Sequence, residues 1–186
     1  MWHELLRDPS LYELLLRLDE DLCTQARDKG CPYCGGPLHA ADYPRKPRGG
    51  PATLPVGYDR RLSLCCGRDG CRKRTTPASV RFLGRRVYLG AMLVLVCAMQ
   101  QGPTRKRLAK LRELFGVSRW TVCRWRRWWL ETFGQTSFWQ EHRGRVMPPP
   151  CEEELPASLL ASFVGAMRER LVALLRFLSP LTVPGS

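Results

Sequence analysis

The sequence lacks the segments that direct a chain into or across a membrane. Its start, residues 1–4, has no basic region followed by an apolar run, so we expect no secretory signal. The longest apolar run, residues 87–99, is shorter than the roughly 20 residues of a membrane-spanning helix. No internal repeat is visible. We therefore expect a cytoplasmic protein without membrane contact, built as one domain or two small ones.

Acidic residues are scarce in the middle of the chain. Residues 42–127 hold 21 basic and 4 acidic side chains, whereas residues 1–41 hold 4 and 7, and residues 128–186 hold 5 and 6. The whole net charge of +13 therefore comes from the middle. Such an excess favours a polyanionic partner or an anionic membrane, and its position indicates a binding surface flanked by elements with other roles.

Cysteine, in contrast, is plentiful: the chain has nine cysteines, and several of them stand in close pairs. In a reducing compartment such pairs favour metal ligands over disulfides. Two tight turns that each offer two thiolates suit one structural Zn²⁺ ion, which takes four ligands in a tetrahedron. The predicted ligands are Cys31, Cys34, Cys66 and Cys71.

The second cysteine pair leaves a choice of ligand. Cys65 competes with Cys66, and we favour Cys66 because it shares strand parity with Leu62 and Leu64 and leaves a shorter turn. A redox pair and unrelated buried cysteines are the alternatives to a metal site. His39 is close enough in sequence to be a substitute ligand, but we expect it to be a surface residue. The remaining cysteines are expected to be packing or exposed residues: Cys23, Cys97, Cys123 and Cys151.

A metal would have a physical purpose here. The segment between the cysteine pairs is rich in glycine, proline and arginine, so it cannot bury enough apolar surface to fold alone. A structural zinc ion would supply folding free energy on the order of 10 kcal/mol. Four thiolates leave no open position for water, which argues against a catalytic zinc.

Apolar periodicity predicts the regular elements. Helices are expected at residues 9–28, 86–101, 104–115, 119–133 and 156–178. Asp8, Thr104 and Ser118 are predicted caps, and Gly116 is placed to end the second of the three central helices. The acidic residues 19–21 are expected on a solvated face. A strand is expected at 58–65, with a partner at 71–76, a basic loop at 42–57 and an irregular linker at 135–154.

Residues 104–131 have the pattern of a helix-turn-helix: an apolar helix, a Gly-Val-Ser turn and a basic helix. In that motif the second helix enters the major groove of DNA, and its first turns reach the base edges. Helical spacing places Val122, Trp125 and Trp129 on the face that packs inward. The alternative is a basic helix in an ordinary helical bundle.

The predicted DNA-contacting residues lie on the opposite side of the basic helix and on its neighbours. They are Ser118, Arg119, Trp120, Thr121, Arg124, Arg127, Arg105, Lys106, Arg72, Lys73 and Arg74. Arginine can contact phosphates, or guanine through two hydrogen bonds. Further basic residues extend this surface toward phosphates: Arg45, Lys46, Arg48, Arg81, Arg85 and Arg86.

A Cys-x-x-Cys ribbon that leads into a helix-turn-helix, with Cys-Arg-Lys-Arg-Thr-Thr-Pro at residues 71–77, resembles the DNA-binding part of bacterial insertion-sequence transposases. It is similar in particular to the small zinc-ribbon and helix-turn-helix proteins that are encoded beside a separate catalytic subunit. The resemblance covers about residues 31–131 and implies recognition of element ends or an accessory role. The second pair departs from the commoner Cys-x-x-Cys, which leaves its ligand choice open.

The sequence thus predicts a mostly helical α+β protein: an N-terminal helix (1–30), a zinc ribbon with a basic loop (31–84), a helix-turn-helix (85–134), a linker (135–154) and a C-terminal amphipathic helix (155–186). We expect a noncatalytic protein that binds double-stranded DNA. The expected partners are a catalytic transposase subunit and a second copy bound through the C-terminal helix. The alternative is a zinc-dependent assembly adaptor or a transcriptional regulator that binds a protein partner.

Overall fold

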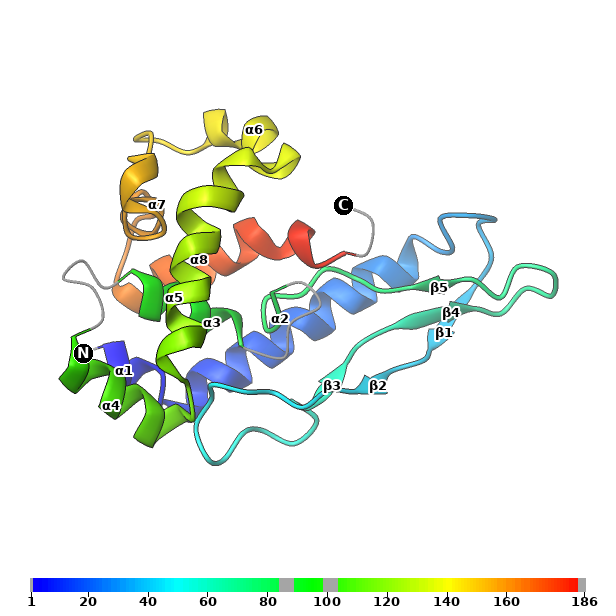
Figure 1. The fold of residues 1–186 in the computed structure, drawn as a ribbon. Helices are drawn as coiled ribbons and strands as arrows, with labels where there is room; N and C mark the ends of the chain where they lie inside the picture. The colour runs from blue at the N-terminus through cyan, green and yellow to red at the C-terminus, as the bar shows by residue number, and fades with distance from the viewer. Residues whose placement is uncertain (1, 84–88, 99–103, 184–186) are drawn as a thin grey trace.

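The structure is a computed structural model that describes residues 2–83, 89–98 and 104–183 (Figure 1). It is a mostly helical α+β fold with small antiparallel sheets. The helices are α1 (Trp2–Leu5), α2 (Pro9–Asp28), α3 (Gly90–Cys97), α4 (Arg105–Phe115), α5 (Arg119–Arg127), α6 (Ser137–His142), α7 (Ala157–Ala161) and α8 (Met167–Leu178). The strands are β1 (Leu38–Ala40), β2 (Tyr43–Pro44), β3 (Arg60–Arg61), β4 (Leu64–Cys66) and β5 (Arg74–Thr75).

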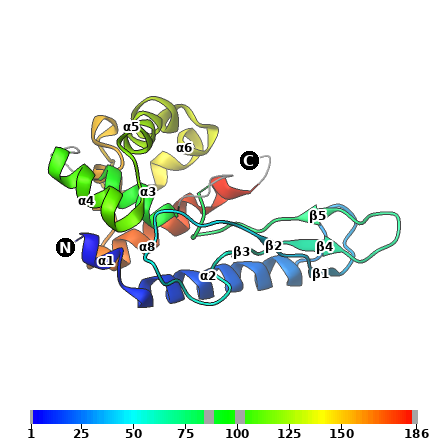
Figure 2. The ribbon, with the colours of Figure 1, turned by 60° about the horizontal axis from the view of Figure 1, so that its bottom comes forward.

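The strands form an extended arm, residues 31–76, that lies beside the C-terminal half of α2 (Figures 1 and 2). One sheet has the order β1-β4-β5, with Leu38 opposite Cys66 and Leu64 opposite Thr75. The second pairs β2 with β3, so that Tyr43 lies opposite Arg61. The predicted pairing of 58–65 with 71–76 is confirmed for β4 and β5, whereas β1 and β2 were not predicted.

The rest of the chain builds a helical body around α3. All eight residues of α3 are buried, and the helix contacts both α5 and α8. The residues of α3 belong to one apolar cluster that also contains Leu15 of α2, Trp125 of α5 and Leu175 of α8. Because α2 and α8 bury their apolar stripes on the same core as α3, the helices that flank the basic segment are part of one packed body.

The turn between α4 and α5 follows the predicted chemistry. The hydroxyl of Thr104 accepts a hydrogen bond from the N–H of Arg107 and begins α4, and Ser118 caps α5 through the N–H of Thr121 in the same way. Gly116 ends α4 with a φ of 63°, a left-handed conformation that favours glycine. Val117 is fully buried and anchors the turn. The two helices therefore enter and leave the turn at fixed residues.

Three expected elements differ from those observed. The helix that follows Ser118 is α-helical only to Arg127 and continues as a π-helical turn, Trp128–Thr132. The region expected as an irregular linker contains α6, whose Phe138 and Trp139 are buried. The single C-terminal helix is instead α7 and α8, because Gly165 has a φ of 107° and the carboxylate of Glu169 caps the start of α8. Residues 99–101 of the expected helix 86–101 lie outside the described part, as do its residues 86–88.

A buried ion pair joins α2, the arm and the segment that precedes α3. The side chains of Asp19 and Arg81 are both fully buried, and the Nε of Arg81 lies 2.8 Å from Oδ2 of Asp19. Arg81 also donates to the carbonyl oxygens of Tyr58 and Arg60, while Asp19 accepts from the hydroxyl of Ser79 and the N–H of Val80. The expectation of a solvated acidic face is therefore wrong for Asp19, and the expectation of a phosphate-contacting Arg81 is wrong as well.

We predict that Asp19→Ala lowers the free energy of unfolding by about 3–5 kcal/mol, because it leaves the Arg81 guanidinium buried without its counter-charge. Asp21→Ala, an exposed position two residues along the same helix, is the matched control and should change it by about 0.5 kcal/mol or less. Urea unfolding followed by circular dichroism measures both values. Equal effects of the two substitutions would contradict a structural role for the pair.

Candidate metal centre and candidate nucleic-acid interface

Four cysteine sulfurs gather at the arm. The Sγ atoms of Cys31, Cys34, Cys66 and Cys71 all lie within 4.8 Å of one another. The Sγ atoms of Cys31 and Cys71 are 3.8 Å apart, and those of Cys34 and Cys66 are 3.5 Å apart. A tetrahedron whose metal–sulfur arms measure about 2.3 Å has edges of about 3.8 Å. The spacing of the sulfurs therefore fits one ion held by four thiolates.

The first knuckle, residues 31–36, is closed by its own backbone. The N–H of Cys31 donates to the carbonyl of Gly36, and the N–H of Gly35 donates to the carbonyl of Cys31. A side chain at Gly36 would meet two of the sulfurs, because its Cβ would lie 3.2 Å from Sγ of Cys66 and 3.3 Å from Sγ of Cys34. Glycine at this position thus lets the chain pass close to the metal ligands.

The second knuckle, residues 66–73, offers backbone donors to sulfur. The N–H of Arg68 lies 3.5 Å from Sγ of Cys66, and the side chain of Arg68 donates to the carbonyl of Cys34 across the site. The turn closes through the N–H of Cys71, which donates to the carbonyl of Arg68. Such donors stabilise thiolate over thiol, so this looser Cys-x₄-Cys spacing still presents two ligands.

The competing ligands point elsewhere. Cys66 is fully buried in the cluster formed with Leu38 and Leu64, whereas the thiol of Cys65 donates to the carbonyl of Arg72 and lies outside the four-sulfur group. Alternate residues of a strand face opposite sides, so strand parity decided correctly between the two. His39 is exposed and also lies outside the group, and its ring packs against Gly67.

The thiols of the group titrate unequally. Burial raises the pKa of Cys31, but hydrogen bonds from the N–H groups of Tyr33 and Cys34 and from the neighbouring thiols outweigh it and lower this pKa to about 7. At Cys66 the N–H of Arg68 lowers the pKa, yet burial and the three other thiols raise it to about 12. The thiolate of Cys31 therefore forms more readily than that of Cys66.

Helix α5 has one buried and one exposed face. Val122 and Trp125 are buried in the core, as is Trp129 in the π-helical continuation, and helical spacing predicts all three. On the other face Arg119, Trp120, Arg124 and Arg127 are exposed, and Trp120 is 84% exposed. Arg127 forms a surface ion pair with Glu131 at 3.6 Å. The core packing on one side therefore fixes which side chains of α5 face the solvent.

A groove lies between α4 and the start of α5, which we call the α4–α5 groove. Its volume is about 510 Å³, and it is lined by Arg105, Leu108, Ala109, Arg112, Ser118, Arg119 and Trp120. Lys106 is exposed beside it on α4. Sequence reasoning missed Arg112, although its spacing of seven residues from Arg105 places both on one helix face.

Thr121 of α5 was predicted to contact DNA, but its position in the structure does not fit this prediction. Thr121 is buried, and its hydroxyl lies 3.0 Å from that of Ser118. The third residue after the cap turns back toward the helix start, so its short side chain completes the cap instead of facing the solvent. Ser118 is exposed, although its hydroxyl oxygen accepts the bond that caps α5.

The basic residues that follow Cys71 are exposed on the arm and have partners within it. Arg72 pairs with Asp69 at 2.7 Å, and the ammonium of Lys73 lies 4.3 Å from the ring centroid of Tyr33. Arg74 donates to the carbonyl of Ala41. Arg74 thus also braces β5 against the residue that follows β1, while its exposed surface stays cationic. The predicted Arg85 and Arg86 lie outside the described residues.

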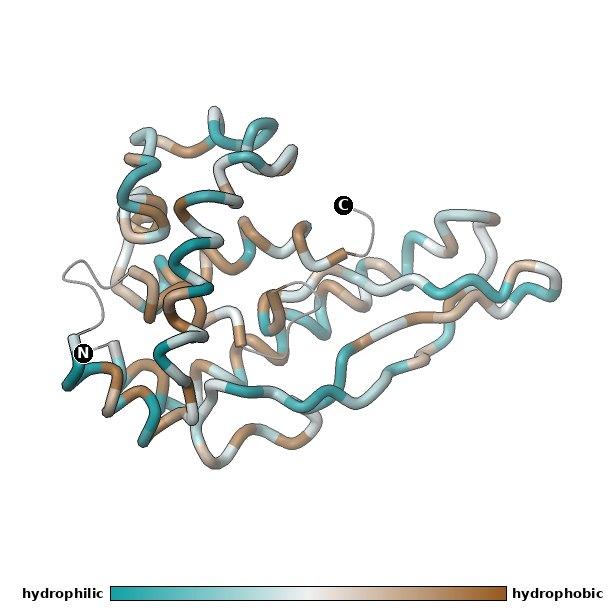
Figure 3. The backbone as a smooth tube through the Cα atoms, in the orientation of Figure 1, coloured by the Kyte–Doolittle hydropathy of each residue, from teal (hydrophilic) through white to brown (hydrophobic). Residues whose placement is uncertain are grey.

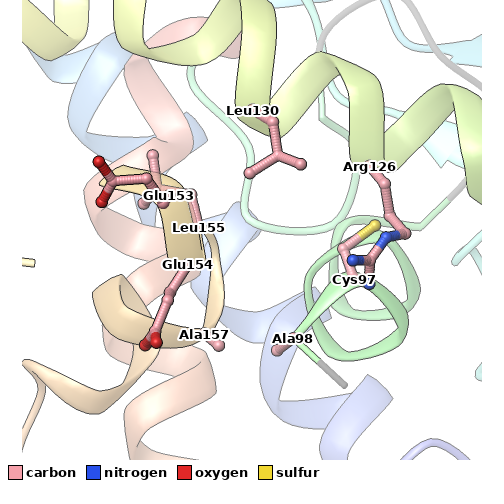
Figure 4. A pocket seen from close by; sticks show the side chains of 8 residues that line it. All are labelled: Cys97, Ala98, Arg126, Leu130, Glu153, Glu154, Leu155 and Ala157. Atoms are coloured by element: carbon pink, nitrogen blue, oxygen red, sulfur yellow. The ribbon is translucent and has the colours of Figure 1, made fainter. Parts of the chain in front are cut away.

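Hydrophilic residues recur along α4, α5 and the arm, where the chain is coloured teal in Figure 3. A second pocket, of about 350 Å³, lies between α3, the end of α5 and α7 (Figure 4). Arg126 approaches Cys97 on one side of it, and Glu153 and Glu154 lie on the other. No sequence pattern pointed to this pocket, because its walls come from three distant segments.

No protein-family profile, curated protein or solved structure matches this chain. Among the described residues, no helix combines the length and the apolar content that crossing a bilayer requires.

We predict that the purified chain binds one Co²⁺ ion per molecule with the intense thiolate-to-metal absorption of a tetrahedral sulfur site. Cys66→Ser should abolish or strongly weaken this absorption, because it removes one of the four converging sulfurs. Cys65→Ser, the adjacent position outside the group, should leave it intact. The reverse result for these two variants would overturn the ligand assignment.

Metal affinity should rise with pH. A metal binds thiolates, while at neutral pH the raised pKa values of Cys66 and Cys71 keep both thiols protonated in the metal-free protein. Binding therefore releases protons, and the apparent Kd should tighten by about tenfold per pH unit for each proton released between pH 6 and 8. Competition titration against a chelator of known affinity measures this, and a pH-independent Kd would contradict it.

Proposed function

We propose that this protein binds double-stranded DNA, and that α4, the turn and α5 act as a helix-turn-helix with α5 in the major groove. The observation that carries the proposal is the two-faced packing of α5. Its apolar residues are buried in the core, while Arg119, Arg124 and Arg127 project from the opposite face. A helix whose apolar face is packed in the core can present the arginines of its exposed face to base edges in a fixed orientation.

The supporting residues divide between two kinds of contact. Arg124 lies on the exposed face one turn beyond Trp120, where the first turns of such a helix meet base edges. Arg105, Lys106 and Arg112 of α4 line or flank the groove beside it and suit phosphate contacts. Arg72, Lys73 and Arg74 extend the cationic surface along the arm. Thr121 is not part of this proposed surface, because it is buried.

In this proposal the ion in the four-cysteine group is Zn²⁺, and the arm is a zinc ribbon. Zinc favours tetrahedral thiolate sites, and four sulfurs leave it no open position for water or substrate. The ion would therefore serve structure: it would hold two turns of a glycine-rich arm together so that the basic residues after Cys71 keep a fixed position. Cys31, Cys34, Cys66 and Cys71 would be its ligands.

The biological setting we propose is a noncatalytic accessory or end-recognition subunit of a transposable element. It rests on the resemblance of residues 31–131 to insertion-sequence proteins of that kind. Within this setting the partner would be a separate catalytic transposase subunit, and a second copy could join through the C-terminal helices. A closed four-thiolate site and a cationic reading helix suit recognition of element ends without chemistry on the DNA.

A protein-binding adaptor is the second candidate function, and one observation favours it. A groove of about 500 Å³ lies between α2 and α8, and its lining includes the apolar Leu14, Leu18 and Val172 together with Arg168 and Arg176. Apolar side chains beside charged ones occur in protein interfaces. In this case DNA affinity would be nonspecific, and changes in α5 would leave partner binding unaffected.

We expect selection from random duplexes to return a preferred sequence, and Arg124→Ala to weaken binding to it by about 5- to 150-fold, as loss of a bidentate base contact does. Binding to random duplex should fall by much less. Arg176→Ala on α8 is the matched control: an exposed arginine outside the proposed DNA surface, which should leave the preference unchanged. Fluorescence anisotropy at fixed salt measures both affinities.

Two results would count against DNA reading by α5. If the selection returns no preferred sequence, the protein does not recognise a specific DNA sequence. Capture of a stable protein partner whose binding is unchanged by Arg119→Ala and Arg124→Ala would favour the adaptor function instead.

A further inference from the structure

Trp120 is placed unlike the other tryptophans of α5 and its π-helical extension. It is 84% exposed, whereas Trp125 and Trp129 are 1% and 0% exposed and pack in the core. A tryptophan side chain carries roughly 150–250 Å² of surface that is favourable to bury. Here that surface stands in solvent on the face of α5 that also presents Arg119 and Arg124. The ring is therefore available to a ligand.

The surroundings of Trp120 define what that ligand would be. The α4–α5 groove combines the indole with the apolar side chains of Leu108 and Ala109, and with the guanidinium groups of Arg105, Arg112 and Arg119. Its volume of about 510 Å³ lies within the range of small-ligand sites, which runs from about 300 to 1,000 Å³. The groove thus pairs a flat apolar surface with three positive charges and suits a planar ligand attached to anions.

An intact duplex does not offer such a ligand to the ring. Bases in a duplex are stacked on one another, so a protein side chain in the major groove meets only their edges. A nucleotide that has left the stack exposes the face of its base and carries phosphates on either side. Aromatic side chains stack on such unpaired bases, and arginines follow the backbone.

We propose that the α4–α5 groove binds an unpaired nucleotide of DNA, with its base stacked on Trp120 and its flanking phosphates near Arg105, Arg112 and Arg119. The inference rests on the proposed DNA binding and narrows the substrate to duplexes that carry an unstacked nucleotide next to paired DNA. Arg124 and Arg127, farther along the same face, contact the paired part.

The test uses the full chain with zinc and two labelled DNAs: an uninterrupted duplex, and the same duplex with one unpaired thymine. We expect tighter binding to the second. Trp120→Ala should reduce that preference by about 5- to 150-fold, the usual range for loss of one stacked base. Trp120→Phe should keep part of it. Leu130→Ala removes another exposed apolar side chain, beyond the end of α5 and outside the groove, and should keep all of it.

A second measurement reports stacking directly. An unpaired base stacked on the indole quenches its fluorescence, so the unpaired DNA should quench the wild-type chain more than the Trp120→Phe variant. Because Trp120 is exposed, neither Trp120→Ala nor Trp120→Phe should change the urea unfolding midpoint. This midpoint serves as the check on folding.

The outcomes separate the two proposals. An equal loss of affinity for both DNAs in Trp120→Ala would show that the ring contacts base edges, and it would overturn the stacking inference while leaving DNA binding in place. Equal wild-type affinity for the two DNAs would overturn the inference as well. Failure of the wild-type chain to bind either DNA would overturn the proposed function, and with it the inference that depends on it.

Discussion

The buried pair of Asp19 and Arg81 is the interaction on which the arrangement of the molecule depends. One guanidinium contacts a carboxylate of α2 and carbonyl oxygens of the arm, and the same carboxylate receives donors from the segment that leads to α3. Both charges have left water, so each requires its partners, and displacement of any one segment would strand a buried charge. The arm and the helical body are thereby held in a fixed relation, and Tyr58 of the arm also joins the apolar cluster of the body.

The arm has only a small apolar cluster, so its folded structure depends on other interactions as well. Its cluster contains three cysteines and two leucines among its fully buried members, with Cys23 supplied by α2. Two of the four converging sulfurs, those of Cys31 and Cys66, belong to this cluster, and those of Cys34 and Cys71 pack against it. An ion bound there would cross-link the two knuckles. The exposed cations of β5 and its preceding turn could then keep their positions despite mutual repulsion.

In the helical body, α5 carries the buried Trp125 on one side and exposed arginines on the other. Trp125 is buried in the core, which α5 joins through its contacts with α3, and Trp129 of the π-helical extension is buried as well. These two side chains fix the rotation of the helix, so the arginines and Trp120 face outward. A surface whose orientation is set by core packing is rigid, and rigidity is what hydrogen bonding to base edges and stacking on a base both require. The proposed contacts to base edges and the proposed stacking on an unpaired base thus both depend on the core packing that orients α5.

The local features could be predicted from the sequence: the capped helices α2 and α4, the Gly116 turn, the inward face of α5 and the cysteine set with Cys66 in preference to Cys65. These follow from helical and strand periodicity, capping chemistry and ligand spacing, which act over a few residues. The packing of distant segments was needed to show that Asp19 and Arg81 are buried, that Thr121 completes a cap, that Arg74 braces the arm, and that Arg112 and Trp120 line one groove. Those outcomes depend on which distant segments come together, and a charge or a hydroxyl looks the same in sequence whether it will meet water or a partner.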